Sequence, residues 1–512
     1  MKNCIRRILC LAFCVFLLQC INLTTNAQTT TTVSGNVANL QSGDNIIYLF
    51  SYYGSDLNEV GSVKLDENGN FTFQVNLIQN DGIYALGFDP ENIAPIVLSN
   101  KETDIKVNAD FLTLQNGDLE VMNSRENEAY RVLRNEYERL AVSMNDSLSL
   151  ESQISIVDPF YKRKTNEMEK KRNLIVKEYN KNLIYIKESF PGNYATDVLV
   201  NLYIIPQLTA RTEFMEAYDN EPAFLHDHFF DYVDFSDTRI FYAPILSEMY
   251  IDYLDEYTHH SPDGLKDSVD ILLSKSKASN AVHDYTIQFL IDVFTDNGPE
   301  ELVDYVIDSV DKLAGCDAPL SEATAVRIEN IKRLRVGNIA PEIASMSPDG
   351  DTITLSSLKG KKTKLIYFWA SWCSFCEEEN TDLVRIYKKY KSKGFEVYAV
   401  ALDEDKEEWL SSINKYKLAW INVSDLQGWD SKYVNTYNVS ATPTTYLLDK
   451  ENRIVAKDLI GYELERELES ILNYTGPVNQ RVTCINKKDR GIIVPAFFVG
   501  INEPSITLEV SS

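Results

Sequence analysis

A chain of 512 residues is too long to bury a single hydrophobic core, and at about 150 residues per domain it should form roughly three folded units. Acidic residues outnumber basic residues by 76 to 50, which gives a formal net charge of -26. Because phosphate groups are also negative, this charge argues against nucleic acid and against an anionic membrane surface as partners.

The first 27 residues have the composition of a secretory signal peptide. The segment starts with basic residues at Lys2, Arg6 and Arg7. An apolar run from Ile8 to Leu18 follows, and it is too short to span a bilayer. The segment ends in a polar stretch at Thr25-Asn26-Ala27. Small residues favour cleavage after Ala27, and the alternative is lipidation at Cys20, where Gln19 is bulky for a lipoprotein signal. We expect an exported protein of the periplasm or cell envelope. It should contact a membrane only if Cys20 is lipidated, as an outer-membrane lipoprotein.

Residues 28–122 alternate between apolar and polar side chains, for example along Phe71-Thr72-Phe73-Gln74-Val75. A period of two is typical of strands with one buried face, so this region should be an antiparallel β-sandwich-like domain. The segment from Asp66 to Asn70 predicts a turn between a strand near Val63 and the strand that starts at Phe71. The region has no charged cluster and no histidine, which favours packing or recognition over catalysis.

Apolar residues at helical spacing start near Asn123 and continue to about Leu334, so residues 123–334 should be an all-α domain, with Ser124 as the first N-cap. Further helices are expected at Lys171 to Glu188, Tyr194 to Leu208, Ile245 to Tyr257, Leu265 to Lys277, Val282 to Thr295 and Glu300 to Leu313. All five histidines lie here, at His226, His228, His259, His260 and His283. They lack His-x3-His helix spacing, so we expect no metal site.

Residues 335–475 alternate strand and helix patterns, which is typical of an α/β domain. Short apolar runs at Lys364 to Phe368 and Phe395 to Leu402 predict buried central strands. The turn at Asp449 to Asn452 predicts antiparallel pairing of two later strands. The remaining tail, residues 476–512, indicates no role.

The segment Trp372-Cys373-Ser374-Phe375-Cys376 carries the most specific chemistry, because two cysteines separated by two residues can close a disulfide and also expose one sulfur for attack. At the start of a helix, unpaired N–H groups favour a thiolate, so Cys373 is the expected nucleophile and Cys376 the resolving thiol. After signal cleavage, Cys316 and Cys484 are the other cysteines, too few for a disulfide scaffold or a second zinc-ligand pair.

Several motifs occur in a fixed order: Gly337-Asn338-Ile339-Ala340-Pro341, Leu358-Lys359-Gly360-Lys361, Trp372-Cys373-x-x-Cys376, and Val439-Ser440-Ala441-Thr442-Pro443-Thr444. With these motifs, residues 336 to 472 resemble the thioredoxin superfamily and, within it, the TlpA/ResA-like envelope thiol-disulfide oxidoreductases. The resemblance covers just over a quarter of the chain. It implies a thioredoxin fold with no cofactor and no metal.

The resemblance also implies roles for residues around the dithiol. It implies a cis peptide bond before Pro443, with Trp372, Thr442 and Pro443 as substrate-binding residues and the Thr442 backbone hydrogen-bonding a substrate strand. It implies that Glu379 tunes the thiols or transfers a proton, and its spacing from Cys376 puts both on one helix face. The alternative for the neighbouring acids is that carboxylates simply suit a first helical turn.

Two departures from the family pattern bear on the chemistry. Tyr367 stands where thioredoxins proper have a buried aspartate, which favours the TlpA/ResA-like branch, and Phe375 stands where a proline commonly precedes the second cysteine. The three carboxylates of Glu377 to Glu379 should oppose a thiolate. Because an oxidant stabilises its reduced thiolate form, we expect a reductase.

The sequence therefore predicts an exported thiol-disulfide oxidoreductase that reduces protein disulfides in the cell envelope with electrons from a membrane-embedded donor. A disulfide isomerase would use the same residues. A thiol peroxidase with antioxidant activity shares the fold, but its usual motif of Thr or Ser and Pro before the cysteine is absent. The last alternative is an envelope binding protein whose residues 28–334 capture a ligand, with the thioredoxin unit as an accessory.

Overall fold

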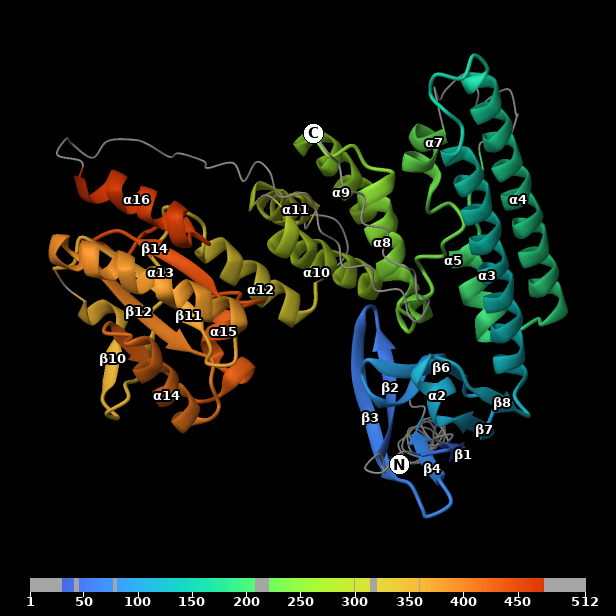
Figure 1. Ribbon diagram of the computed structural model, residues 1–512, viewed down its shortest axis with the longest axis horizontal. Helices are drawn as coiled ribbons and strands as arrows, with labels where there is room; N and C mark the ends of the chain where they lie inside the picture. The colour runs from blue at the N-terminus through green and yellow to red at the C-terminus, as the bar shows by residue number, and fades with distance from the viewer. Residues whose placement is uncertain are drawn as a thin grey trace, which may run out of the picture. The chain divides into compact units, whose positions relative to one another are not determined.

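The computed structural model describes residues 30–40, 46–76, 81–207, 221–298, 300–313, 320–358 and 360–473. These residues form two compact units, one that ends at Val282 and one that starts at His283 (Figure 1). The predicted signal peptide, Cys316, Cys484 and the tail after residue 476 lie outside the described residues. The predicted domain boundaries at 122/123 and 334/335 stay predictions.

The first unit starts with a β-rich region. Its strands are β1 (Thr30–Ala38), β2 (Ile46–Tyr53), β3 (Asp56–Lys64), β4 (Asn70–Asn76), β5 (Gly82–Asp89), β6 (Asn92–Leu98), β7 (Asp104–Asp110) and β8 (Glu120–Met122). They form two four-stranded sheets, ordered β4-β1-β7-β8 and β3-β2-β5-β6, and apolar side chains from both sheets share one core. Burial alternates along β4 as its sequence predicts. All pairs are antiparallel except β1 with β7, which is parallel.

The predicted turn from Asp66 to Asn70 joins β3 to β4 and thereby connects the two sheets. One carboxylate oxygen of Asp66 accepts hydrogen bonds from the backbone N–H groups of Asn68 and Asn70, at 2.8 and 2.9 Å. Gly69 has a φ of 79°, and a Cβ atom there would lie 2.2 Å from the Val37 carbonyl oxygen. The turn therefore requires glycine at this position.

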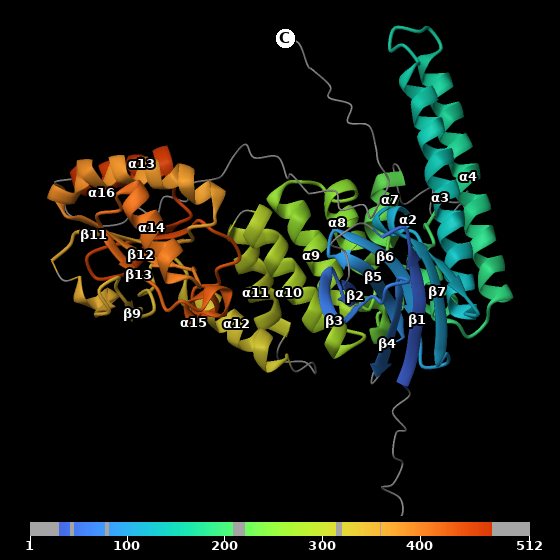
Figure 2. The same cartoon turned by 60° about the horizontal axis from the view of Figure 1, so that its bottom comes forward.

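The rest of the first unit is helical. Its elements are α2 (Phe111–Gln115), α3 (Arg125–Ser152), α4 (Tyr161–Ser189), a π-helical turn η1 (Ala195–Leu199), α5 (Val200–Tyr203), α7 (Glu221–His228), a 3-10 turn η2 (Thr238–Phe241), α8 (Ile245–Glu256) and α9 (Pro262–Ser276). Ser124 caps α3 as predicted, since its side chain accepts a hydrogen bond from the Asn127 N–H. Helices α3 and α4 pack as a long hairpin (Figure 2).

One predicted helix is wrong at its end. The helix expected from Tyr194 to Leu208 stops at Tyr203, and Ile204 has an extended backbone with a ψ of 124°. Pro206 explains this, because proline disfavours helical geometry in the residue before it and donates no backbone hydrogen bond.

Asn127 links the β-rich and helical parts of the first unit. Its buried side chain accepts a hydrogen bond from the Val97 N–H and donates one to the Val97 carbonyl, each at 2.8 Å. Val97 lies in β6, an edge strand of its sheet, so α3 satisfies backbone groups that the sheet leaves unpaired.

The second unit starts with three helices, α10 to α12, and an α/β domain follows them. Its helices are α10 (Asn280–Asn297, which starts in the first unit), α11 (Glu300–Leu313), α12 (Glu322–Arg333), α13 (Ser374–Tyr390), α14 (Lys406–Tyr416), α15 (Lys432–Thr436) and α16 (Gly461–Asn473). Its 3-10 turns are η3 (Leu355–Ser357), η4 (Lys391–Lys393) and η5 (Gly428–Asp430). Its strands are β9 (Ala344–Met346), β10 (Thr352–Thr354), β11 (Thr363–Trp369), β12 (Phe395–Ala401), β13 (Ile421–Val423), β14 (Thr444–Leu448) and β15 (Ile454–Lys457).

The central sheet of the second unit has the order β13-β12-β11-β14-β15. Strand β11 pairs in parallel with β12 and antiparallel with β14, and every residue of β11 and β12 is buried. Helices α13 and α16 lie side by side on one face (Figure 2). The β-rich, helical and α/β regions confirm the predicted fold class, and the antiparallel pairing of β14 with β15 confirms the predicted turn. Among the described helices, none is both long enough and apolar enough to cross a membrane.

A buried lysine fixes the turn between β14 and β15. The Lys364 side chain is 2 % exposed, and its ammonium donates hydrogen bonds to the carbonyl oxygens of Asp449 and Lys450, at 3.0 and 3.1 Å, and to the side chain of Asn452. Burial lowers the pKa of Lys364. The same hydrogen bonds tie the central strand β11 to the turn between β14 and β15.

We expect Lys364→Met to destabilise the second unit by about 1 to 3 kcal/mol, because the apolar stem is kept while the turn carbonyls lose their donor. Urea unfolding followed by near-ultraviolet circular dichroism, together with hydrogen exchange of the β14 amides, measures the effect. Lys388→Met on the exposed surface of α13 is the matched control and should change the free energy of unfolding by less than about 0.5 kcal/mol. Equal effects of the two substitutions would contradict this role for Lys364.

Candidate active site

The dithiol lies where the buried strand β11 ends and α13 begins. Cys373 is the N-cap of α13, with an extended backbone at φ -85° and ψ 109°. Its sulfur accepts a hydrogen bond from the Cys376 N–H at 3.1 Å. The unpaired N–H groups and positive dipole end of the helix thus face this sulfur, and both favour a thiolate.

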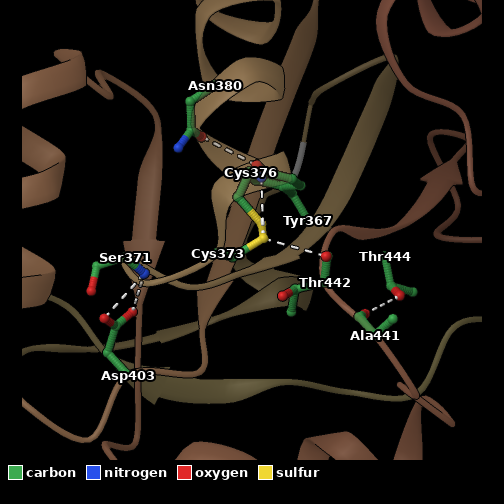
Figure 3. The surroundings of a disulfide bond; sticks show 9 residues. All are labelled: Tyr367, Ser371, Cys373, Cys376, Asn380, Asp403, Ala441, Thr442 and Thr444. Carbon is green, nitrogen blue, oxygen red and sulfur yellow. Dashed lines mark hydrogen bonds between the residues drawn. A yellow bond between two sulfur atoms is a disulfide. The ribbon is translucent and has the colours of Figure 1, made fainter. Parts of the chain in front are cut away.

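Cys373 and Cys376 form a disulfide in the structure (Figure 3). Cys373 is 6 % exposed and Cys376 is fully buried, so an incoming group reaches Cys373 first. The Cys373 sulfur lies 3.3 Å from the backbone carbonyl oxygen of Thr442. The peptide bond between Thr442 and Pro443 is cis, as the resemblance implies. The structure therefore brings together four of the predicted site residues: Cys373, Cys376, Thr442 and Pro443.

Tyr367 and Asn380 lie on the inner side of the disulfide (Figure 3). Tyr367 is fully buried in β11, and its hydroxyl donates a hydrogen bond to the Asn380 side chain at 3.2 Å. Burial, with a further contribution from Glu379, raises the pKa of Tyr367 well above its usual value. Tyr367 therefore contributes a neutral hydroxyl to the buried surroundings of the disulfide.

The three consecutive carboxylates differ in their surroundings. Glu379 is buried, accepts a hydrogen bond from the Gly461 N–H at 3.2 Å, and has its pKa raised to about 7 by burial. Glu377 is exposed, and hydrogen bonds from Tyr416 and Lys415 lower its pKa. Glu378 is exposed. The expectation that all three oppose a thiolate is therefore too broad, because Glu379 alone shares the buried helix face of Cys376.

Asp403 was not identified from the sequence. It is 1 % exposed, and its two carboxylate oxygens lie 3.1 and 3.2 Å from the donating Ser371 N–H (Figure 3). Burial raises the pKa of Asp403. Asp403 follows β12, whose carboxyl end lies next to that of its parallel neighbour β11. The rule that sites form at the carboxyl ends of parallel strands could have identified it.

Aromatic side chains form the exposed rim of the site. Trp372 is 54 % exposed, and its ring centroid lies 6.1 Å from that of Trp429, which is also exposed. Phe375, between the cysteines, is 74 % exposed. Trp429 comes from the turn η5, far along the chain, and no periodic pattern could have placed it beside the dithiol.

Four histidines, His226, His228, His259 and His260, have ordinary polar partners. A ring nitrogen of His226 lies 2.9 Å from the Asp227 carboxylate, and one of His228 lies 2.6 Å from Asp231. Within the described ranges, no three His, Cys, Asp or Glu side chains gather in a way that could hold a metal ion.

Three segments of the chain match protein-family models. Residues 336–457 match the model of the AhpC/TSA family. Residues 31–130 and 206–297 match models of two domains of unknown function, DUF4369 and DUF5106.

The chain is also similar to individual proteins. It is 32 % identical to a thiol-disulfide oxidoreductase ResA of Bacillus cereus over 146 residues, which cover 28 % of this chain and 82 % of ResA. The ResA of Bacillus subtilis is 32 % identical over 141 residues, 28 % of this chain and 76 % of that protein. Among solved structures, a thiol-disulfide oxidoreductase from Bacteroides fragilis is 33 % identical, with 26 % of this chain and all of that chain covered and a TM-score of 0.26. A thioredoxin-like protein from Bacteroides caccae is 24 % identical, with 52 % and 96 % covered and a TM-score of 0.35.

The residues that match the AhpC/TSA model, 336–457, include the Cys373–Cys376 disulfide. The identity and coverage of the relatives named ResA establish common ancestry. Through this C-terminal module, the chain belongs to the TlpA/ResA-like thiol-disulfide oxidoreductases of the thioredoxin superfamily.

Proposed function

We propose that this oxidoreductase is exported and reduces disulfide bonds of proteins in the cell envelope. The observation that carries the proposal is the pair of unequal sulfurs: Cys373 at a helix N-terminus and partly accessible, Cys376 covered behind it. Export is supported by the signal-like composition of residues 1–27. Lipidation at Cys20 would make the protein an outer-membrane lipoprotein.

The proposed cycle starts from the dithiol. The Cys373 thiolate attacks one sulfur of a substrate disulfide, forms a mixed disulfide and releases the other substrate sulfur as a thiolate. The Cys376 thiolate then attacks the Cys373 sulfur and releases the second substrate thiol. The substrate has gained two electrons, and Cys373 and Cys376 are left as a disulfide. A membrane-embedded dithiol donor returns two electrons by the same exchange.

The groups around Cys373 support roles in substrate binding. The Thr442 carbonyl lies 3.3 Å from the reacting sulfur and can accept a backbone N–H from an extended substrate segment, in the manner of strand addition. Pro443 holds this loop with its cis peptide bond. Trp372 offers an exposed aromatic surface beside the sulfur. We assign Trp372, Thr442 and Pro443 to substrate binding.

Glu379 is proposed to control the ionisation of the thiols. Its carboxyl group is neutral at pH values below about 7 and negatively charged above, because burial raises its pKa to about 7. A neutral carboxyl can donate a proton to a leaving thiolate, while the charged form opposes a thiolate on the same helix face. Above about pH 7, the negative charge of Glu379 would therefore make ionisation of the thiols less favourable than it would be beside a neutral carboxyl group.

Replacement of the resolving thiol tests the proposed cycle. We expect Cys376→Ser to accumulate mixed disulfides between Cys373 and envelope proteins, because the second exchange step cannot occur. Non-reducing electrophoresis and mass spectrometry of the adducts measure this.

The matched control is Cys373→Ser/Cys376→Ser. In this variant, adducts can form only through Cys316 or Cys484, or through a leader cysteine in a chain that is neither lipidated nor cleaved. A binding protein with an accessory thioredoxin unit predicts equal adduct levels in the single and double variants. That result would refute the proposed reductase.

The role of Glu379 predicts a pH-dependent effect of Glu379→Gln. Below about pH 6 the two proteins should react alike, because both side chains are neutral. As the pH rises through 7, the variant should alkylate at Cys373 roughly three to ten times faster, since the opposing charge is absent. Iodoacetamide labelling of the reduced protein, read on the Cys373 peptide by mass spectrometry, measures the rates.

Glu378→Gln removes an exposed carboxylate from the adjacent position and serves as the control for total charge. Its labelling rates should follow those of the unsubstituted protein at every pH. A ratio between the Glu379→Gln and unsubstituted rates that stays constant from pH 5 to 9 would show that ionisation of Glu379 does not act on the thiols.

A further inference from the structure

The far end of the α3–α4 hairpin exposes large apolar side chains. This hairpin tip consists of residues 148–164, and Figure 2 shows it beyond the other elements of the first unit. The exposed fractions are 79 % for Ile156, 83 % for Val157 and 56 % for Phe160. Leu148 and Leu150, on the last turns of α3, are about half exposed. Apolar side chains this exposed and this close together mark a surface that contacts something else.

Hydrogen bonds hold the hairpin tip in a defined turn. The Asp158 carboxylate accepts a hydrogen bond from the Phe160 N–H at 2.7 Å and pairs with the Lys164 ammonium at 2.6 Å. The Asp158 N–H donates to the Ser155 carbonyl at 2.9 Å. Ile156 and Val157 lie inside this turn, and their side chains are largely exposed to solvent. The apolar surface is therefore built into the turn.

Basic side chains lie directly beside the apolar ones. Within the hairpin tip there are three basic residues, Lys162, Arg163 and Lys164, and two acidic residues, Glu151 and Asp158, so three positive charges against two negative ones leave the segment with a net charge of +1 in a chain with a net charge of -26. The Arg163 guanidinium lies 4.8 Å from the centre of the Phe160 ring. Lys162 and Arg163 are exposed. A long cationic side chain next to an exposed aromatic ring is typical of segments at a membrane interface.

We propose that the hairpin tip docks on the surface of a bilayer that contains anionic phospholipids. Ile156, Val157 and Phe160 enter the boundary between headgroups and acyl chains, and Lys162 and Arg163 contact lipid phosphates. A protruding tip can insert its apolar side chains into the acyl-chain region of a bilayer, and its positive charge is complementary to an anionic lipid surface. The total charge of the chain argues against such a surface, but the charge is unevenly distributed, and the tip is locally positive.

This docking goes beyond the proposed reductase and does not depend on it. It would hold an envelope oxidoreductase at a membrane without a spanning helix and without lipidation. One apolar contact with a bilayer is reversible, so the docked and free forms should exchange.

Vesicle co-sedimentation of the unlipidated chain from Gln28 tests the proposal. The protein should bind vesicles of phosphatidylglycerol and phosphatidylethanolamine, and bind phosphatidylcholine vesicles at least about tenfold more weakly. The triple variant Ile156→Ser/Val157→Ser/Phe160→Ser should lose roughly tenfold or more in vesicle affinity. The double variant Lys162→Gln/Arg163→Gln should lose the preference for anionic vesicles and the dependence on salt.

Matched control variants come from the shaft of the same hairpin. Leu174→Ser/Ile184→Ser/Tyr185→Ser removes three side chains that are 66 %, 53 % and 70 % exposed, and Lys177→Gln/Lys181→Gln removes two exposed lysines. Both should bind vesicles like the unsubstituted protein. Circular dichroism should show equal helix content in all variants. No binding to anionic vesicles, or equal losses in the tip and shaft variants, would overturn the proposal and leave a protein as the partner of the tip.

Discussion

Complete burial of strand β11 is the constraint on which the redox site depends. All seven of its residues are shielded from solvent, between β12 on one side and β14 on the other. The strand ends at Trp369, and three residues separate it from Cys373. The next helix then starts with the attacking sulfur as its cap. The same sheet positions the cis-proline loop, because β14 pairs with β11 and starts directly after Pro443.

Two buried carboxyl groups lie on the chain segments that adjoin this strand end, and they differ in what they contact. Asp403 holds the backbone at Ser371, two residues before the attacking sulfur. Glu379 lies on the helix that carries both sulfurs, with its pKa raised to about 7 by burial. Negative charge at such positions makes a thiolate less favourable, and a dithiol whose thiolate is disfavoured is a better electron donor. Both buried carboxyl groups therefore favour the reducing direction of the proposed cycle.

The sequence predicted the parts of the fold that repeat a regular pattern. Alternation along Phe71 to Val75 and the apolar run at Lys364 to Phe368 identified their strands, because burial of one or both faces leaves a periodic trace. Helix ends were less predictable, as at Tyr203, where a proline three residues later ends the helix.

The active site could be predicted only in part. Adjacent motif residues such as Cys373 and Cys376 were found, since their spacing is itself the chemical signal. Trp429 and Asp403 are brought to the site by tertiary packing, which leaves no local pattern. Glu379 is buried while its neighbours Glu377 and Glu378 are exposed, and three consecutive glutamates in a sequence do not reveal this difference. The local positive charge of the hairpin tip could not be predicted from the strongly negative total charge of the chain.

If the Cys373–Cys376 pair donates electrons to protein disulfides of the cell envelope, as proposed, its reduction potential must lie below that of its surroundings. Equilibration of the purified protein with mixtures of reduced and oxidised glutathione, followed by quantification of the dithiol and disulfide forms, gives the potential. A protein-disulfide reductase should have a value clearly more negative than about -210 mV, below the roughly -180 to -210 mV poise of a secretory compartment. A potential of about -180 mV or higher would identify an oxidant and rule out the proposed reducing cycle.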